Sequence, residues 1–156
     1  MESDRTKQRA YVLVVDDNPV VLEVCRAFLE DVESLEAEVS SVGLMTATSG
    51  DEALDAVRQL AIDGARVACA LVDMHLDDGA DGIEIMRSLW EFDPDIHCTL
   101  VTGEAASFEE TVRDRIPDVF RDKWNFLGKP FTQVDLVERV LCAIRAWLVC
   151  APSVAG

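Results

Sequence analysis

Short apolar runs alternate with longer segments of helical apolar period along most of this chain, and this alternation limits the fold more than any other feature. Strands and helices that alternate in this way build βαβ units, whose strands run parallel. The sequence therefore predicts an α/β fold with a mostly parallel sheet of five strands. The candidate strands cover residues 11–15, 42–48, 67–72, 96–101 and 124–128.

Five segments of helical apolar period follow these strands. In the first, Asn18 is a favourable N-cap and Pro19 a favourable first helical residue. The apolar stripe expected to face the core comprises Val20, Val21, Val24, Cys25, Phe28, Leu29 and Val32. The second opens at Ser49 on a capping-box pattern. The fourth, within residues 104–123, is polar and contains Pro117, so we expect it to break into two short pieces.

A single domain is expected over residues 10–150, with short tails at 1–9 and 151–156. The chain has 156 residues, of which 49% are hydrophobic, which is enough for one core. No internal repeat or low-complexity linker divides it.

The net charge of −16 restricts the classes of partner. An acidic surface repels nucleic-acid phosphates and anionic lipid headgroups, so neither is expected as a direct partner. No apolar run approaches the ~18 residues of a membrane span, and the first residues lack the apolar segment of a signal peptide. We therefore expect a soluble, cytoplasmic protein.

The five cysteines are odd in number and widely spaced, with no CxxC pair. This pattern argues against a disulfide framework and against a zinc site. We expect the cysteines to act as small, buried apolar residues of a protein in a reducing compartment. They are Cys25, Cys69, Cys98, Cys142 and Cys150.

Polar residues of distinct chemistry follow four of the predicted strands. Asp16 and Asp17 follow the first strand, Asp73 the third, Thr102 the fourth and Lys129 the fifth. Carboxyl ends of parallel strands meet at one edge of a sheet, where ligands of such folds bind. The sequence therefore predicts three acids, a hydroxyl and an ammonium at one edge.

Three carboxylates in one place require positive charge. Two of them about 4 Å apart repel by roughly 4 kcal/mol at an effective dielectric constant near 20. Lys129 supplies one positive charge, and all-oxygen ligation favours Mg²⁺, with Mn²⁺ as the alternative, over zinc for the second. A cation beside an accessible carboxylate, a lysine and a hydroxyl suits phosphoryl transfer, with Asp73 as nucleophile.

Six motifs, taken together and in order, resemble the receiver domains of two-component response regulators, the CheY-like superfamily, over about residues 10–149. That resemblance implies a flavodoxin-like three-layer sandwich with strand order 2-1-3-4-5 and five helices. The motifs are VLVVDDNP (12–19), TATSGDEAL (46–54), ALVDMHL (70–76), DGIEIM (81–86), LVTG (100–103) and FLGKPF (126–131).

The resemblance implies a role for each acid. Asp73 would be the phosphorylated aspartate. Asp17 and Asp73 would bind Mg²⁺ directly, together with the backbone carbonyl of His75, and Asp16 would act through a water molecule.

The resemblance also implies roles for the remaining site residues. The Thr102 hydroxyl would bond the phosphoryl group, Lys129 matches the lysine of the family motif, and Phe126 would be the aromatic switch. The peptide bond after Lys129 is expected to be cis. His75 and Glu104 occupy the two variable positions that tune attack of water on the acyl phosphate.

A signalling switch rather than an enzyme is therefore expected, with slow self-dephosphorylation only. A histidine kinase or a histidine phosphotransfer protein would donate the phosphoryl group. Phosphorylation would reshape the face built from residues 104–123, 124–128 and 132–150, which a partner or a second copy would recognise as in a homodimer. Whether the chain stands alone or is a piece of a larger regulator or hybrid histidine kinase stays open.

Alternative interpretations follow from the same residues. A Mg²⁺-dependent phosphatase with an aspartyl nucleophile would carry a second acid two residues later, where this chain has His75. A flavodoxin-like cofactor binder would need a phosphate cradle that the first strand-to-helix turn lacks.

The loop after Asp73 has one residue more than the usual family pattern. The acidic residues Asp77, Asp78, Asp81, Glu109 and Glu110 are interpreted as a solvated face.

Overall fold

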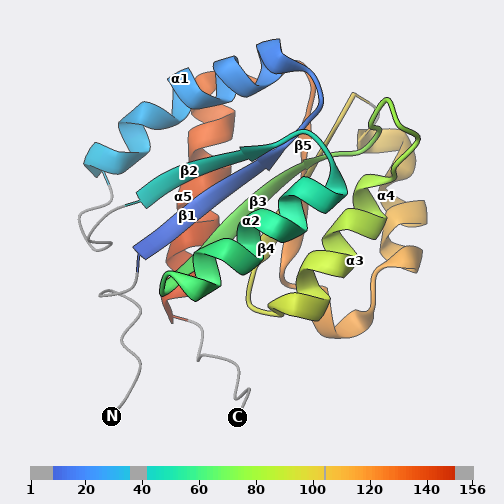
Figure 1. Cartoon of the computed structure of the whole chain (residues 1–156). Helices are drawn as coiled ribbons and strands as arrows, with labels where there is room; N and C mark the ends of the chain where they lie inside the picture. The colour runs from blue at the N-terminus through green and yellow to red at the C-terminus, as the bar shows by residue number, and fades with distance from the viewer. Residues whose placement is uncertain (1–8, 36–41, 104, 150–156) are drawn as a thin grey trace.

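The computed structural model describes residues 9–35, 42–103 and 105–149, as alternating strands and helices (Figure 1). The elements are β1 (Arg9–Val15), α1 (Pro19–Leu35), β2 (Val42–Ala47), α2 (Gly50–Ile62), β3 (Ala65–Asp73), α3 (Gly82–Phe92), β4 (His97–Thr102), α4 (Ala105–Arg115), the 3-10 turn η2 (Asp118–Phe120), β5 (Trp124–Gly128) and α5 (Gln133–Val149). The predicted strands are all present, with ends that differ by at most two residues.

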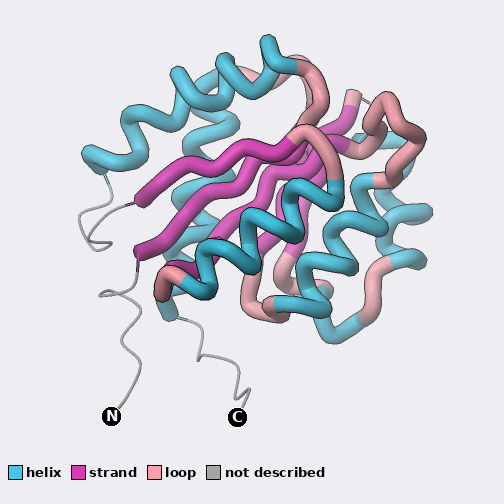
Figure 2. Tube along the Cα trace, in the orientation of Figure 1, coloured by secondary structure: helices cyan, strands magenta, loops and turns pink. Residues whose placement is uncertain are grey.

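The five strands form one parallel sheet in the order β2-β1-β3-β4-β5. Figure 2 shows the sheet between two layers of helices. One core cluster joins α1 and α5 to one face, and the other joins α2, α3 and α4 to the opposite face. The predicted three-layer α/β sandwich is therefore confirmed.

Side-chain caps fix where the helices start. Asn18 Oδ1 accepts from the Val20 amide at 2.9 Å at the start of α1. Ser49 Oγ accepts from the Glu52 amide at 3.1 Å, and Glu52 in return accepts from the amide of Thr48. These contacts satisfy amides that lack partners inside a helix, as the sequence predicts.

The fourth helix breaks where the sequence predicts a break. Pro117 separates α4 from η2, and the side chains of Val112 in α4 and of Ile116, directly after its last residue, are buried. In η2, the Phe120 ring stacks on Trp90 of α3, with ring centroids 4.4 Å apart. The connection between α4 and β5 is thus packed against α3.

Two expectations about burial were wrong. Val20 and Val24, assigned to the apolar stripe of the first helix, are exposed, because α1 packs through the other described members of that stripe, which are Val21, Cys25, Phe28 and Leu29. Cys142 is exposed as well.

The other described cysteines match the prediction. Cys25, Cys69 and Cys98 are buried and free. Burial, with a further contribution from the Asp16 charge, raises the pKa of Cys25 to about 11, so this thiol is protonated at neutral pH. Cys150 and the predicted tails, apart from Arg9 in β1, lie outside the described residues.

Candidate functional site

Three aspartates meet at the carboxyl edge of the sheet. Asp16 and Asp17 follow β1, and Asp73 ends the neighbouring strand β3. One carboxylate oxygen of each lies within 4.8 Å of the others. Asp16 and Asp73 are buried, whereas Asp17 is half-buried. Neighbouring strands thus create the cluster that the sequence predicts.

Lys129 brings an ammonium group into this cluster. Its Nζ lies 3.2 Å from Asp73 Oδ1 and 3.6 Å from Asp16 Oδ2. The Lys129 amide donates to the Thr102 carbonyl at 2.9 Å, which ties the segment after β5 to the end of β4. The peptide bond from Lys129 to Pro130 is cis, as the resemblance implies.

The protonation of Asp16 reflects its crowded surroundings. Burial is the largest cause that raises its pKa, and the charges of Asp73 and Asp17 raise it further. The Asn18 amide, which donates to Asp16 Oδ1 at 2.8 Å, opposes that shift, as does Lys129. These opposing contacts do not cancel the cost of burying the carboxylate.

The donor set of the cluster fits a hard divalent cation. Three carboxylates face one ammonium, so the ionised cluster retains two negative charges. Oxygen ligands suit Mg²⁺ or Mn²⁺, and the cluster offers none of the sulfur or imidazole ligands typical of zinc. Asp16, Asp17 and Asp73 could therefore hold such an ion.

The two predicted switch residues lie on the neighbouring strands. Thr102 is buried at the end of β4, one residue beyond the partner of Asp73 in the sheet register. Phe126 is half-buried in β5 and packs edge-on against Trp124, with ring centroids 5.2 Å apart. Phe126 also contacts the core cluster that includes α3 and α4. The strands thus connect the carboxylate edge with the α4 side of the molecule.

The structure describes one of the two positions that are predicted to tune the dephosphorylation rate. His75 is exposed in the loop between β3 and α3, where it forms an isolated bridge with Asp81. Glu104 lies outside the described residues. Their effect on dephosphorylation stays a prediction.

One of the five acidic residues interpreted as a solvated face is not solvated, because Asp81 is half-buried, whereas Asp77, Asp78, Glu109 and Glu110 are exposed. The Asp77 amide donates to Asp17 Oδ2. Asp81 is half-buried: its Oδ1 accepts from the Ile83 amide at 2.7 Å, and its Oδ2 pairs with Arg115 at 2.7 Å. The charge run alone gave no signal for these contacts, although the position of Asp81 before α3 is typical of an N-cap.

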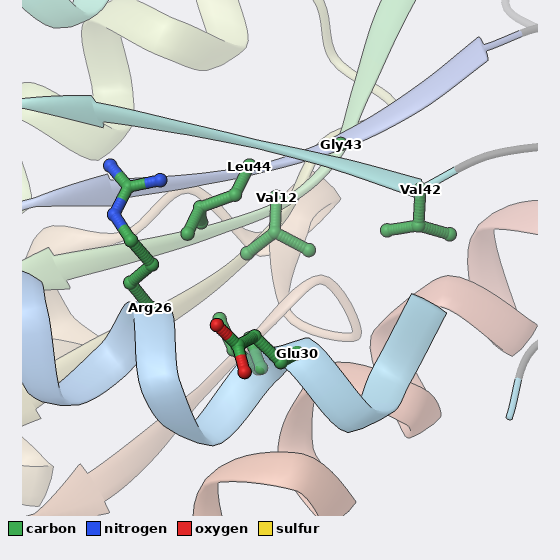
Figure 3. A pocket seen from close by; sticks show the side chains of 7 residues that line it. Val12, Arg26, Glu30, Val42, Gly43 and Leu44 are labelled. Carbon is green, nitrogen blue, oxygen red and sulfur yellow. The ribbon is translucent and has the colours of Figure 1, made fainter. Parts of the chain in front are cut away.

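A cavity of about 240 Å³ lies away from this edge, between α1 and the edge strand β2 (Figure 3). Its lining consists of aliphatic side chains of the helix and strands together with Arg26 and Glu30 of α1, and the Arg26 side chain extends toward the sheet. None of the predicted site residues that the structure describes borders it. We therefore locate the candidate site at the carboxyl edge.

Comparison with known protein families shows the family to which a chain with this arrangement belongs. The sequence profile of the response regulator receiver domain matches residues 12–141. This chain belongs to the receiver domain family. The match spans the sheet from β1 to β5 and all the predicted site residues.

Solved receiver structures share the fold. A CheY-like receiver domain protein from Methanospirillum hungatei JF-1 is 18% identical, with a TM-score of 0.65 over 88% of this chain and 96% of that chain. The signal receiver domain of an HD domain-containing protein from Pseudomonas fluorescens Pf-5 is 17% identical, with a TM-score of 0.66 over 90% of each chain. A receiver protein from Sinorhizobium medicae WSM419 is 21% identical, with a TM-score of 0.63 over 89% of this chain and 97% of that one. No curated protein shows significant similarity to the sequence.

Membership of the receiver family carries general properties. Receiver domains are phosphoacceptor switches of two-component signalling, and they typically bind Mg²⁺ at an acidic pocket. A histidine kinase or phosphotransfer protein is the general partner of the family. In the part of the chain that the structure describes, no helix has both the length and the apolarity to cross a membrane.

Proposed function

We propose that this receiver accepts a phosphoryl group on Asp73, in the presence of Mg²⁺ held by Asp17 and Asp73, by the backbone carbonyl of His75, and by Asp16 through a water molecule. The observation that carries the proposal is the Asp73 carboxylate, in contact with Lys129 and within 4.8 Å of two further aspartates. A divalent cation supplies the positive charge that stabilises the oxygens of a transferring phosphoryl group.

Each residue has a distinct part in the transfer. An oxygen of Asp73 attacks phosphorus and forms the new P–O bond, while the P–N bond of a donor phosphohistidine breaks and its electron pair stays on the imidazole. The Lys129 ammonium, already 3.2 Å from Asp73, offsets negative charge on the phosphoryl oxygens. The Thr102 hydroxyl donates to the aspartyl phosphate once it has formed.

The response to phosphorylation is proposed to reach the α4-β5-α5 face. Thr102 and Phe126 are in adjacent strands, and Phe126 contacts the core beneath α4. Movement of Thr102 toward the phosphoryl group would free space for the Phe126 ring, and the face would change shape. A downstream partner or a second copy of the domain would then recognise it.

Labelling with a small phosphodonor tests the proposed function. Acetyl phosphate with Mg²⁺ should add one phosphoryl group, seen by intact mass, and Asp73→Asn should abolish this gain. Asp122→Asn is the matched control, because Asp122 is an exposed carboxylate before β5, at the opposite end of that strand from Lys129. Sustained turnover of a phosphate ester, or labelling that persists in Asp73→Asn, would contradict the proposal.

A further inference from the structure

The loop between β3 and α3, residues 74–81, touches both the carboxylate cluster and α4. On one side the Asp77 amide donates to Asp17 Oδ2. On the other side Asp81 Oδ2 accepts from Arg115 Nη1, in the last turn of α4, at 2.7 Å. The loop therefore connects a predicted metal ligand with the helix on the proposed output face.

Hydrogen bonds within the loop make it a compact unit. The Leu76 amide donates to the Ala80 carbonyl at 3.2 Å, and the Gly79 amide donates to the Leu76 carbonyl at 3.0 Å. The side chains of Met74 and Leu76 are buried in the core. A loop closed and anchored in this way moves as one piece, so a shift at Asp77 reaches Asp81.

The loop also closes directly against the phosphoacceptor backbone. The Gly82 amide donates to the Met74 carbonyl at 2.9 Å. A Cβ atom at Gly82 would lie only 2.4 Å from the Asp73 carbonyl oxygen. Because the backbone at Asp73 and Gly82 is in close contact, a movement of the Asp73 backbone would displace the start of α3.

The α4 end of this connection is equally well fixed. Val112 and Ile116, on either side of Arg115, are buried in the core cluster shared with α3. Asp81 uses its second carboxylate oxygen to cap α3 through the Ile83 amide. The ion pair, 34 residues apart in sequence, therefore joins two anchored segments.

We propose that Arg115 is a positioning residue that couples the loop after Asp73 to α4, as a second route beside Thr102 and Phe126. The inference rests on the proposed function, because phosphorylation of Asp73 is the event that the loop transmits. Arg115 touches neither the phosphoryl group nor the metal and acts through Asp81.

Amide hydrogen exchange of labelled and unlabelled protein tests this coupling. Phosphorylation of the native chain should change exchange in the loop and in residues 109–115 of α4. In Arg115→Ala, labelling and the loop response should persist, while the α4 response falls about two- to fivefold, the range that a half-exposed ion pair can supply. Arg115→Lys, which keeps the charge, should restore part of the response.

Arg87→Ala is the matched control, because Arg87 is an exposed arginine of α3 and its removal changes the net charge equally. It should behave as the native chain. A full α4 response in Arg115→Ala, or an equal loss in Arg87→Ala, would overturn the coupling.

Failure of the proposed function would be distinguishable from failure of the coupling. If acetyl phosphate labels no form of the protein, the proposed function is wrong. The coupling is then judged on the unlabelled proteins. Exchange of the Leu76 and Gly79 amides should be about two- to fivefold faster in Arg115→Ala than in Arg87→Ala, and equal rates would overturn the coupling too.

Discussion

The Lys129 ammonium lies 3.2 Å from Asp73 Oδ1, although the two residues are 56 positions apart in the chain. This contact places the lysine at the proposed acceptor carboxylate. Because Lys129 follows β5 directly, a rearrangement of this contact would act on the strand that carries Phe126.

Removal of this ammonium should separate phosphorylation from the response. Lys129→Ala should still be labelled by acetyl phosphate, because Asp73 and the metal ligands remain. On phosphorylation, amide hydrogen exchange in α4, β5 and α5 should change much less than in the native chain, because the variant lacks the ammonium group that responds to the new negative charge at Asp73. A complete exchange response in labelled Lys129→Ala would show that Lys129 has no part in the coupling.

Loss of a proposed metal ligand should weaken Mg²⁺ binding. Asp17→Ala removes one of the three carboxylates, so the dissociation constant for Mg²⁺ should rise by about tenfold or more. Isothermal titration calorimetry measures this, with Asp78→Ala, an exposed acid of the neighbouring loop, as the control of equal charge. Equal affinities in native protein and Asp17→Ala would argue against the assigned ligand.

The charge on Asp16 should destabilise the metal-free fold at neutral pH. Its pKa is raised in the folded protein, mainly by burial, so the folded chain binds this proton more tightly than the unfolded chain does. The free energy of unfolding therefore falls as pH rises through the folded-state pKa, and the penalty disappears at lower pH.

Asp16→Asn tests that penalty and retains an oxygen to accept from the Asn18 amide. Urea denaturation in EDTA should find the variant more stable than the native chain at pH 7, with the difference shrinking toward pH 4 and below. A variant that is less stable at pH 7, or a pH-independent difference, would be inconsistent with this explanation.

The close approach at Gly82 predicts a sharp difference between two glycines. Gly82→Ala places a methyl group against the Asp73 carbonyl and should lower the free energy of unfolding by about 1–3 kcal/mol. Gly103→Ala is the control, because nothing lies within 4 Å of its added methyl group. Equal urea midpoints for the two variants would mean that the loop can move away without cost.

The sequence predicted the sheet and the carboxylate cluster well for a physical reason. Each apolar run shows where its strand ends, and parallel strands have their carboxyl ends at the same edge of the sheet. Asp16, Asp17 and Asp73 could therefore be placed at one edge without knowledge of the packing. The strand order came from the family resemblance, because the apolar pattern alone does not say which strands are neighbours.

Contacts set by tertiary packing could not be predicted in this way. Arg115 meets Asp81 only because α4 and α3 both pack on one core, and no local pattern encodes that pair. Helix rotation caused the errors at Val20 and Cys142. The apolar spacing indicates that one face of a helix is buried, but it does not determine how far the helix turns about its own axis. In α5 the buried face includes Leu136 and Trp147.

Chemical mapping of the phosphoryl group tests the central claim most directly. The protein is incubated with acetyl phosphate and Mg²⁺, the acyl phosphate is reduced with borohydride, and the modified peptide is sequenced by mass spectrometry. We predict that the peptide spanning β3 carries the modification at Asp73 and nowhere else. Modification at a different residue, or an unmodified protein after exposure to excess donor, would contradict the account.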